Sequence, residues 1–430
     1  MKNCLKSYPA AVLLLLLCTS PVAAAEPTIT TLLEAVAAQP DMAASALGVK
    51  AIDTQLQQAY AELYPKVSAF GSYTRYNSPT NLRPMAPTEV NIAAGDSIPF
   101  SEQIARYGLQ LEMPVFVKSL YTLADKVKQL QKASRAGHKL RLVTRQAAVV
   151  ALDASLAFNA HLDKAIASRL DSLHKTRDDL QLAVDNGRTP ESELLKVKTL
   201  LNDLQKQRND LQRQATSLTS QIEQLTGIRL NNFVPIDLQR PVLNDDFIRE
   251  KQQIAKVAAA EKGLQQAKEQ RYPVLKLEGV LSENSGNAYN TDQSIDRSYN
   301  YVGVKLALPL FNRSLHTAIT QADIQLRREK RQLSQLQIDL ATTAENLRLQ
   351  LPIIGRSTEL AQTSLNNNQQ LLDIAKVAFR NGRMTTEEYL RFETQVLDAE
   401  AALHKTHVDR WQIISQQAVL YGDDLTGVVQ

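Results

Sequence analysis

The sequence predicts a mainly α-helical chain with four short β-strands, built from two copies of one structural unit. Three observations predict this fold class. Glycine (15 of 430 residues) and aromatic residues (5%) are too sparse for an all-β chain. Residues 119–185 contain no proline and one glycine, which favours one very long helix. Short motifs also occur twice in the same order, which indicates a duplicated fold.

Four pairs of motifs define the repeat. The first pair is separated by 208 positions and the other three by 195 positions. In chain order the pairs are Tyr64-Pro65 and Tyr272-Pro273, Pro114-Val115-Phe116 and Pro309-Leu310-Phe311, Asn186-Gly187-Arg188 and Asn381-Gly382-Arg383, and Leu225/Gly227 and Leu420/Gly422. The repeats are expected at 26–227 and 245–422, joined by a linker at 228–244 in the equatorial region and followed by a short tail at 423–430. The difference of 13 residues is expected in the first outer loop.

The N-terminus has the pattern of a secretory signal peptide at 1–25. Lys2 and Lys6 precede an apolar run from Ala10 to Cys18, and small residues precede Glu26. Cys4 and Cys18 both lie in this segment, so the mature chain is expected to lack cysteine and disulfides. Cleavage near Ala25 is preferred over a lipoprotein cysteine at Cys18, because Leu17 is not small.

Charge and hydropathy exclude other classes of partner and anchor. Removing Lys2 and Lys6 from 49 basic residues leaves 47, against 45 acidic residues, a net charge of +2. This balance gives no reason to expect nucleic acid or an anionic membrane surface as a partner. No apolar run of about 18 residues follows the signal peptide, so no transmembrane helix is expected.

Both repeats contain the same elements in the same order. A helix (41–63, then 245–271) ends at the Tyr-Pro pair, since proline disfavours helix in the residue before it. A strand (67–77, then 274–282), a polar loop (78–102, then 283–297) and a second strand (104–113, then 301–308) follow. A long helix comes next (119–185, then 314–380), with a kink expected at Pro352.

The strands alternate between apolar and polar residues. Three apolar series show it: Tyr107, Leu109, Leu111 and Met113; Leu275, Leu277 and Leu281; and Val302, Val304, Leu306 and Leu308. Strict alternation places one face in an apolar medium and the other in water. A sheet packed on a globular core is the ordinary explanation. Here the strands have the roughly ten residues that cross an outer membrane at a tilt, and no separate core is evident beside them.

The helices have the lengths of a rod. Residues 119–185 would span roughly 100 Å as a helix. A shorter helix at 190–226 and the helix at 245–271, placed end to end, would reach nearly the same length. Each half is therefore expected to hold one continuous and one broken length of helix, with the break at 227–244, which contains Pro235 and Pro241.

Four strands cannot close a membrane sheet. An open edge would leave backbone groups unpaired in hydrocarbon, and known barrels begin at about eight strands. The chain is therefore expected to pool strands with copies of itself in a closed cyclic assembly.

The order helix, Tyr-Pro, strand, loop, strand, Pro-x-Phe, long helix, Asn-Gly-x, helix, given twice behind a signal peptide, resembles the TolC family of outer-membrane efflux proteins. The resemblance covers essentially the whole mature chain. It implies a homotrimer whose twelve strands form an outer-membrane β-barrel in contact with lipid, continued by a long periplasmic α-helical barrel. It also implies a periplasmic adaptor (membrane fusion) protein and an inner-membrane pump of the RND or ABC type as partners.

The resemblance also implies two functional regions. The segments Asn186-Gly187-Arg188 and Asn381-Gly382-Arg383 correspond to the periplasmic tip turns that dock on the adaptor, and glycine suits a tight reversal between helices. Glu193 and Glu388, six positions past each glycine, correspond to an acidic ring at the entrance. Solvated surface glutamates are the alternative. Arg391 stands where some members have another acidic residue, so local pairing of Glu388 with Arg391 on one helix face is a further alternative.

The function expected is a passive exit duct for a tripartite efflux system, multidrug or similar, or for type I secretion. A periplasmic coiled-coil scaffold or adaptor without a barrel is the alternative. No catalytic motif or cofactor is expected. His404 and His407, three apart on a helix, are expected on a solvated face rather than on a metal. Trp411 is expected to serve packing or an interface.

Overall fold

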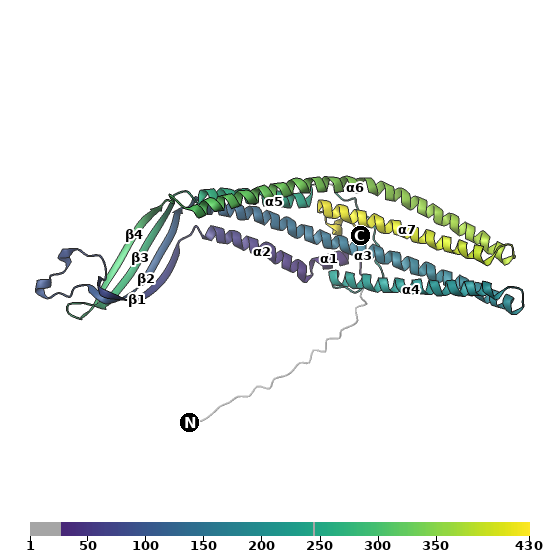
Figure 1. The fold of residues 1–430 in the computed structure, drawn as a ribbon, viewed down its shortest axis with the longest axis horizontal. Coiled ribbons are helices and arrows are strands. Elements are labelled where there is room, and N and C mark those ends of the chain that lie inside the picture. The colour runs from purple at the N-terminus through teal and green to yellow at the C-terminus, as the bar shows by residue number, and fades with distance from the viewer. Residues whose placement is uncertain (1–26, 244–245) are drawn as a thin grey trace, which may run out of the picture.

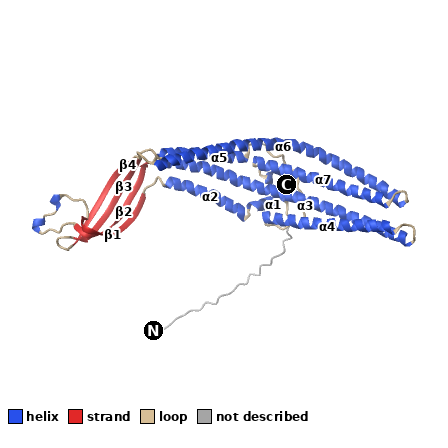
Figure 2. Cartoon of the chain, viewed as in Figure 1, coloured by secondary structure: helices blue, strands red, loops and turns tan. Residues whose placement is uncertain are grey.

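The computed structural model describes residues 27–243 and 246–430, and it shows an elongated molecule. A small sheet forms one end, helices form the body, and two helical hairpins form the other end (Figures 1 and 2). The expected signal peptide at 1–25, including Cys4 and Cys18, lies outside the described residues. None of the described helices is long and apolar enough to cross a membrane.

The first repeat contains helices α1–α4 and strands β1 and β2. Their bounds are α1 Ile29–Ala37, α2 Pro40–Ala61, β1 Lys66–Asn81, β2 Phe100–Phe116, α3 Lys118–Asp185 and α4 Glu191–Thr226. Two 3₁₀ turns, η1 Pro87–Glu89 and η2 Ile92–Ala94, lie in the β1–β2 connection. The helix α1 was not expected from the sequence, and the strands extend farther outward than the alternation indicated.

The second repeat follows the same order. Its bounds are α5 Ile248–Glu269, β3 Val274–Asn287, β4 Ser294–Ala307, α6 Arg313–Arg380 and α7 Thr386–Tyr421, followed by η3 Leu425–Gly427. The helix α6 passes through Pro352 as one helix, so this proline does not break it. In Figure 1 α6 arches over the middle of the molecule.

The outer connections differ in length. The β1–β2 connection comprises residues 82–99, whereas the β3–β4 connection comprises only residues 288–293. The 13-residue difference between the repeats is therefore accounted for almost entirely by the outer loop, as the repeat offsets predicted.

The body of the molecule is a layer of paired helices around α3. The helix α4 packs along the half of α3 near the hairpin turns, and α5 packs along the half near the sheet (Figure 1). The helix α7 packs on both α6 and α3. The two shorter helices therefore lie end to end beside the long one, with residues 227–247 between them, as helix lengths predicted.

The largest hydrophobic core lies halfway along the rod. Helix α1, the interhelical segment at 228–243 and the C-terminal residues pack here against α3. Ile29, Leu33, Val150, Leu425 and Val429 are fully buried. Leu238 and Val429 form an antiparallel bridge, with hydrogen bonds of 3.0 Å in both directions between the backbones of Asp237 and Gln430. The C-terminal residues are therefore part of the core of the equatorial region.

The four strands form one antiparallel sheet in the order β1-β2-β3-β4. Residues paired across strands share a face. Leu109 pairs with Ala69 and Leu281, and Leu111 pairs with Val67 and Gly279. The apolar face carries Val67, Tyr73, Tyr107, Leu109, Leu111, Met113, Leu277, Leu281, Val302, Val304 and Leu306. The alternating apolar residues read from the sequence thus share one face of the sheet, on which Glu283 and Asn300 also lie.

The opposite, polar face carries the residues between them. It includes Ser68, Ser72, Arg106, Gln110, Glu112, Lys276, Glu278, Ser282, Asn284, Arg297 and Lys305. Glu112 and Lys276 form an ion pair of 2.5 Å on this face, and Glu278 and Lys305 another of 3.4 Å. The sheet therefore has one mainly apolar face and one face on which these charged and polar residues lie together with Phe70, Val280, Tyr299 and Tyr301.

Candidate functional site

The two hairpin turns at the far end of the rod have the same backbone geometry. Gly187 and Gly382 both have φ of 68°, in the left-handed region. The N–H of Arg188 donates to the carbonyl of Ala183 at 2.8 Å, and the N–H of Arg383 donates to Ala378 at 2.9 Å. These bonds satisfy carbonyls that the helix end would leave unpaired, and glycine permits the required conformation without steric cost.

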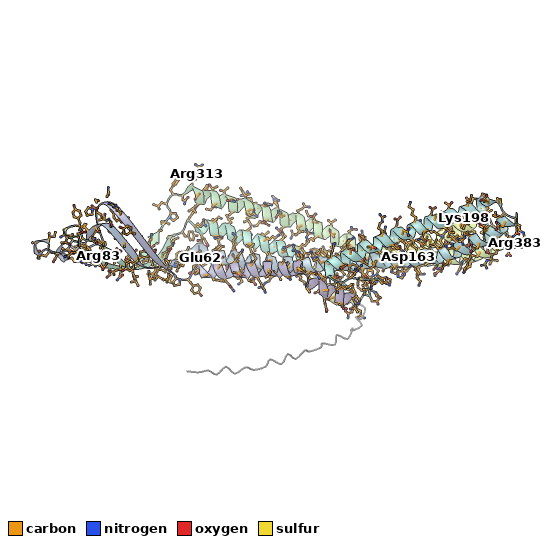
Figure 3. All side chains as sticks on the ribbon, turned by 90° about the horizontal axis from the view of Figure 1, so that it is seen from below. Glu62, Arg83, Asp163, Lys198, Arg313 and Arg383 are labelled. Carbon is orange, nitrogen blue, oxygen red and sulfur yellow. The ribbon has the colours of Figure 1, made fainter. Side chains whose placement is uncertain are left out.

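The tip residues expected from the sequence are all exposed. Asn186, Gly187, Arg188, Asn381, Gly382 and Arg383 lie at the surface of the two turns. Figure 3 shows Arg383 at the tip end, opposite Arg83 at the sheet end. A groove of about 960 Å³ runs between the first turns of α4 and α7, lined by Leu195, Lys196, Glu388 and Arg391 among others. The fold thus brings both hairpins together around one exposed groove.

Glu193 is held by a lysine of its own helix. Its carboxylate accepts a hydrogen bond from Lys196 at 3.0 Å. This bond lowers the pKa of Glu193, and burial opposes the shift. Lys196 also lies 3.9 Å from Glu387 of α7, which links the two hairpins by charge. Glu193 therefore faces the other hairpin rather than bulk solvent alone.

Glu388 has a capping role. Its carboxylate accepts from the backbone N–H of Thr385 at 3.0 Å, and the Thr385 hydroxyl accepts from the N–H of Glu388 at 3.2 Å. This reciprocal pair is a capping box at the start of α7. The Thr385 N–H is the largest cause of the lowered pKa of Glu388, and Arg391 adds a smaller effect. The local partner of Glu388 is thus Thr385, while the Arg391 guanidinium lies 5.8 Å from the Phe392 ring.

A buried polar cluster behind the tips joins α3 to α7, and sequence reasoning missed it. Arg169 of α3, only 5% exposed, donates to Thr394 at 3.1 Å and to the backbone carbonyl of Glu393. The Glu393 carboxylate accepts from Tyr389 at 2.5 Å and from Ser172 at 3.1 Å. An arginine within an alanine- and leucine-rich helix gives no sign in sequence of which helix it will meet.

His404 differs from the expectation of a solvated face, whereas His407 is exposed as expected. The rings of His404 and His161 stack with centroids 4.2 Å apart and an interplanar angle of 4°. Burial, with the nearby His161 and His407, lowers the pKa of His404 to about 4. Within residues 27–243 and 246–430, no group of three or more metal-binding side chains has the geometry for a metal ion. His404 is thus a packing residue between α7 and α3. Trp411 packs against the equatorial core.

The repeated Tyr-Pro and Pro-x-Phe motifs lie at one level of the sheet. Tyr64 and Tyr272 precede β1 and β3, while Phe116 ends β2 and Phe311 follows β4. Because the strands are antiparallel, all four aromatic residues lie at the end of the sheet that meets the helices. All four are exposed. A level of exposed aromatic rings is typical of a membrane–water interface.

The described arrangement defines a class of protein: a four-stranded, two-faced sheet on a long helical rod with paired tip turns. Residues 251–416 match the family model described as outer membrane efflux protein. The resemblance to the TolC family, drawn from the repeated motifs, is confirmed by this match and by the fold.

Solved structures with the same fold cover nearly the whole chain. VceC, an outer membrane protein of Vibrio cholerae, is 13% identical with a TM-score of 0.75, covering 93% of this chain and 96% of VceC. The CmeC outer membrane channel of Campylobacter jejuni is 17% identical with a TM-score of 0.76, covering 93% and 85%. The MtrE outer membrane channel of Neisseria gonorrhoeae, in its open state, is 13% identical with a TM-score of 0.70, covering 94% and 91%. No curated protein sequence matches the chain.

Proposed function

We propose that this chain is an outer-membrane exit duct of a tripartite efflux system. The observation that carries the proposal is the mainly apolar face of a sheet whose edge strands, β1 and β4, are each paired on one side only among the described residues of the chain. In hydrocarbon these edges must pair, and identical copies joined in a ring provide the partner. Three chains would give twelve strands.

The aromatic residues support a membrane span of the right thickness. Tyr73 and Tyr107, both exposed on the apolar face, lie nine residues from Tyr64 and Phe116 along β1 and β2. Nine residues of strand span about 30 Å, and a tilt of about 40° reduces this to roughly 23 Å along the membrane normal, close to the apolar band of about 25 Å in outer-membrane barrels. The apolar face between these aromatics would contact lipid, and the polar face would line the pore.

The proposed duct has no catalysis of its own. Its substrates would be driven by an inner-membrane pump of the RND or ABC type, reached through a periplasmic adaptor. The two tip turns, centred on Gly187 and Gly382, would dock on the adaptor. Their equal geometry supports this, because a trimer would present six similar turns around one axis.

The carboxylates near the tips would form the periplasmic entrance. In a trimer Glu193 and Glu388 would each contribute a ring of three carboxylates, with Arg391 beside the second. Carboxylate rings favour cations when the passage is narrow. Glu388 has the double role of capping α7, so a change here affects the helix start as well as the charge.

Fractionation and conductance test the proposal. The mature protein should be extracted by detergent from the outer-membrane fraction as a trimer, and it should form ion-conducting pores in planar bilayers. Recovery as a soluble periplasmic monomer would instead favour the scaffold or adaptor alternative. Glu193→Gln and Glu388→Gln should each lower cation selectivity. Glu345→Gln, an exposed α6 glutamate bound to Arg348, is a control for charge alone, and equal selectivity in all variants would exclude the entrance assignment.

Docking at the tips needs a separate experiment. The double variant Arg188→Glu and Arg383→Glu should lose co-purification with the adaptor while remaining a trimer. Arg213→Glu, an exposed change on α4 away from the turns, is the matched control. Retention of the adaptor by the tip variant would place the docking surface elsewhere.

A further inference from the structure

The polar face of the sheet carries an apolar cluster at its outer end, away from the helices. Ile104 pairs with Thr74 and Gly286, and Gly286 pairs with Ile295, so both isoleucines belong to the polar face. Ile104 is fully buried and Ile295 is 7% exposed. Both isoleucines lie at the outer end of the strands, where another segment of the chain covers them.

The cover is the first part of the β1–β2 connection. Leu82, 2% exposed, packs with Ile104, Ala288 and Ile295. Its backbone carbonyl accepts a hydrogen bond of 2.8 Å from Nδ2 of Asn284, a buried residue on the polar face of β3. The chain leaving β1 therefore turns inward across β2 and is fixed to β3, rather than turning outward toward the apolar face.

The far part of the same connection is attached to the second repeat. The Ser97 hydroxyl lies 2.8 Å from that of Thr291, and the N–H of Ile98 donates to the side-chain oxygen of Asn290 at 2.9 Å. The Asn290 side chain in turn donates to the carbonyl of Asp96 at 3.0 Å. Both ends of the long connection are thus held against the β3–β4 side, while its middle projects beyond the strands (Figure 1).

We propose that residues 82–99 form an inward-fixed cover that narrows the outer mouth of the pore and limits the size of molecules that pass. The inference rests on the proposed function, in which the polar face lines the pore. In a closed trimer, three such covers would converge from the wall toward the axis. The short connection at 288–293 cannot do this alone, which gives the length difference between the repeats a function.

The hydrogen bonding at the base of the cover is incomplete, which is consistent with a cover that can be displaced. Among the described residues, Asn81 Oδ1, Arg83 Nε and Asn284 Oδ1 are buried without a protein partner. All three lie at the base of the cover. A few hydrogen bonds and one small apolar cluster fix it, so a large cargo can displace it at modest cost.

Thiol labelling from outside the cell tests the cover independently of the periplasmic entrance. Ser72 lies exposed on the polar face, on the periplasmic side of the cluster. The mature chain is expected to lack cysteine, so Ser72→Cys provides one reactive group. Intact cells receive either a small membrane-impermeant thiol reagent or a bulky polyethylene-glycol maleimide. The measurement is made on Ser72→Cys with the native connection and on Ser72→Cys with residues 84–97 replaced by a short Gly-Ser turn.

The small reagent should label the introduced thiol at similar rates in both proteins. The bulky reagent should label the shortened protein faster by about tenfold or more, because its rate follows the population with an open cover. Asn284→Ala should give an intermediate increase, and Asn287→Ala, an exposed neighbour on β3, should give none. If the bulky reagent labels the native and the shortened protein at equal rates, or labels neither, the proposed cover is excluded. Failure of the small reagent to label either protein would mean that the polar face is not a water-filled pore, and would overturn the proposed function as well.

Discussion

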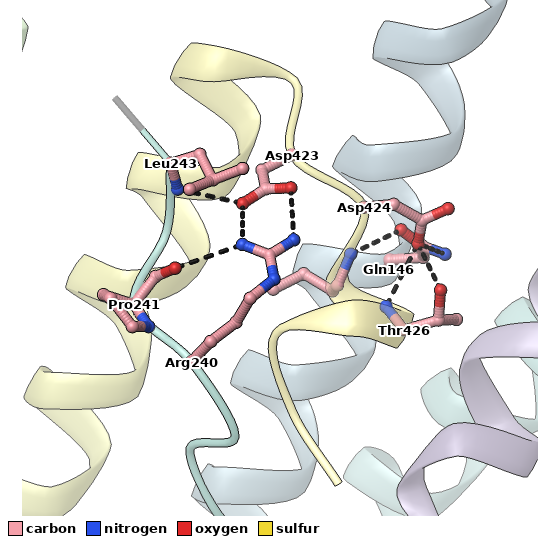
Figure 4. A network of polar contacts seen from close by, with 8 residues as sticks. Gln146, Arg240, Pro241, Leu243, Asp423, Asp424 and Thr426 are labelled. Carbon is pink, nitrogen blue, oxygen red and sulfur yellow. Dashed lines mark hydrogen bonds and ion pairs between the residues drawn. The ribbon is translucent and has the colours of Figure 1, made fainter. Parts of the chain in front are cut away.

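Arg240 and Asp423 form a two-pronged ion pair that ties the segment between α4 and α5 to the end of α7. Nη1 and Nη2 of Arg240 lie 2.7 and 2.8 Å from the two carboxylate oxygens of Asp423 (Figure 4). Asp423 also accepts from the backbone N–H of Leu243 at 3.0 Å. Beside it, Gln146 of α3 donates to Asp424 at 2.9 Å. The segments that flank the second repeat thus meet beside helix α3 of the first repeat.

Breaking this pair should loosen the equatorial region. Arg240→Ala should lower the free energy of unfolding by about 1–2 kcal/mol, a modest value because Arg240 is partly exposed. The hydrogen bond from Arg240 lowers the pKa of Asp423, while burial opposes this. A lowered carboxyl pKa stabilises the fold above the ordinary value of 3.8 and loses that effect as the pH falls below it. Thermal unfolding of wild type and variant should therefore differ at pH 7 and converge at strongly acid pH. A constant difference would contradict the assignment.

Asp153 should make the protein less stable at alkaline pH. It is fully buried, and only one carboxylate oxygen has a partner, the N–H of Val234 at 2.9 Å. Burial raises the pKa of Asp153 to about 7. A raised carboxyl pKa means that the folded state holds the proton more tightly, so stability falls as the pH rises from 3.8 through about 7.

Asp153→Asn should remove this dependence, because the amide keeps the acceptor and carries no charge. At pH 9 the variant should be more stable than wild type by about 2–4 kcal/mol. Unfolding midpoints measured between pH 5 and pH 9 test this. Asp163→Asn is the control. Asp163 lies on α3, as Asp153 does, and its carboxylate is 2.9 Å from Arg208 of α4, so this variant should not gain stability at alkaline pH.

The stacked pair His161 and His404 should lower the stability of the fold at acidic pH. Because the pKa of His404 is lowered to about 4, the folded state keeps this ring neutral. The unfolded chain binds the proton below its ordinary value of 6.5, so stability falls as the pH drops from 6.5 toward 4. His161 and His407 are the neighbouring groups that oppose a proton on His404, and Arg410 acts on the adjacent His407.

His404→Phe keeps a flat ring against His161 and removes the titration. The variant should lose less stability than wild type between pH 6.5 and pH 4.5. His174→Phe on α3, away from the stacked pair, is the control. If both variants follow the wild-type acid profile, the stacked ring is not the group responsible.

The sequence predicted the regular parts of the fold for identifiable physical reasons. The strands were evident because apolar and polar residues alternate, and the hairpins because Asn-Gly-Arg interrupts long helical stretches twice. The equatorial core was not evident from the sequence, because Leu425, Val428 and Val429 lie in a segment too short to show periodicity. The cluster around Leu82 was hidden for a related reason. Ile104 and Ile295 interrupt the polar series of the sheet, and only the three-dimensional path of the loop explains them.

Of the candidate site, the sequence predicted the positions of the two turns but not the side-chain contacts around them. Gly187 and Gly382 were placed correctly at two equivalent reversals, because a left-handed residue is a local requirement. The partners of Glu193 and Glu388 depend on side-chain geometry within one helical turn, where Lys196 and Thr385 compete with other neighbours. The Arg169–Glu393 contact joins residues 224 positions apart, and no local pattern reports it.

Alanine substitutions at three glycines distinguish the effect of backbone conformation on stability from the effect of steric space around the residue. At Gly187, Gly382 and Gly355 a Cβ atom would meet no atom within 4 Å. Gly187 and Gly382 have φ of 68°, whereas Gly355 lies inside the helix α6. Gly187→Ala and Gly382→Ala should each cost about 1 kcal/mol, since alanine is strained in the left-handed region. Gly355→Ala should instead stabilise the protein by about 0.5–1 kcal/mol. Chemical denaturation measures all three, and adaptor co-purification should weaken only for the two tip variants. Equal stability changes at all three positions would show that the tip turns do not require glycine for its backbone.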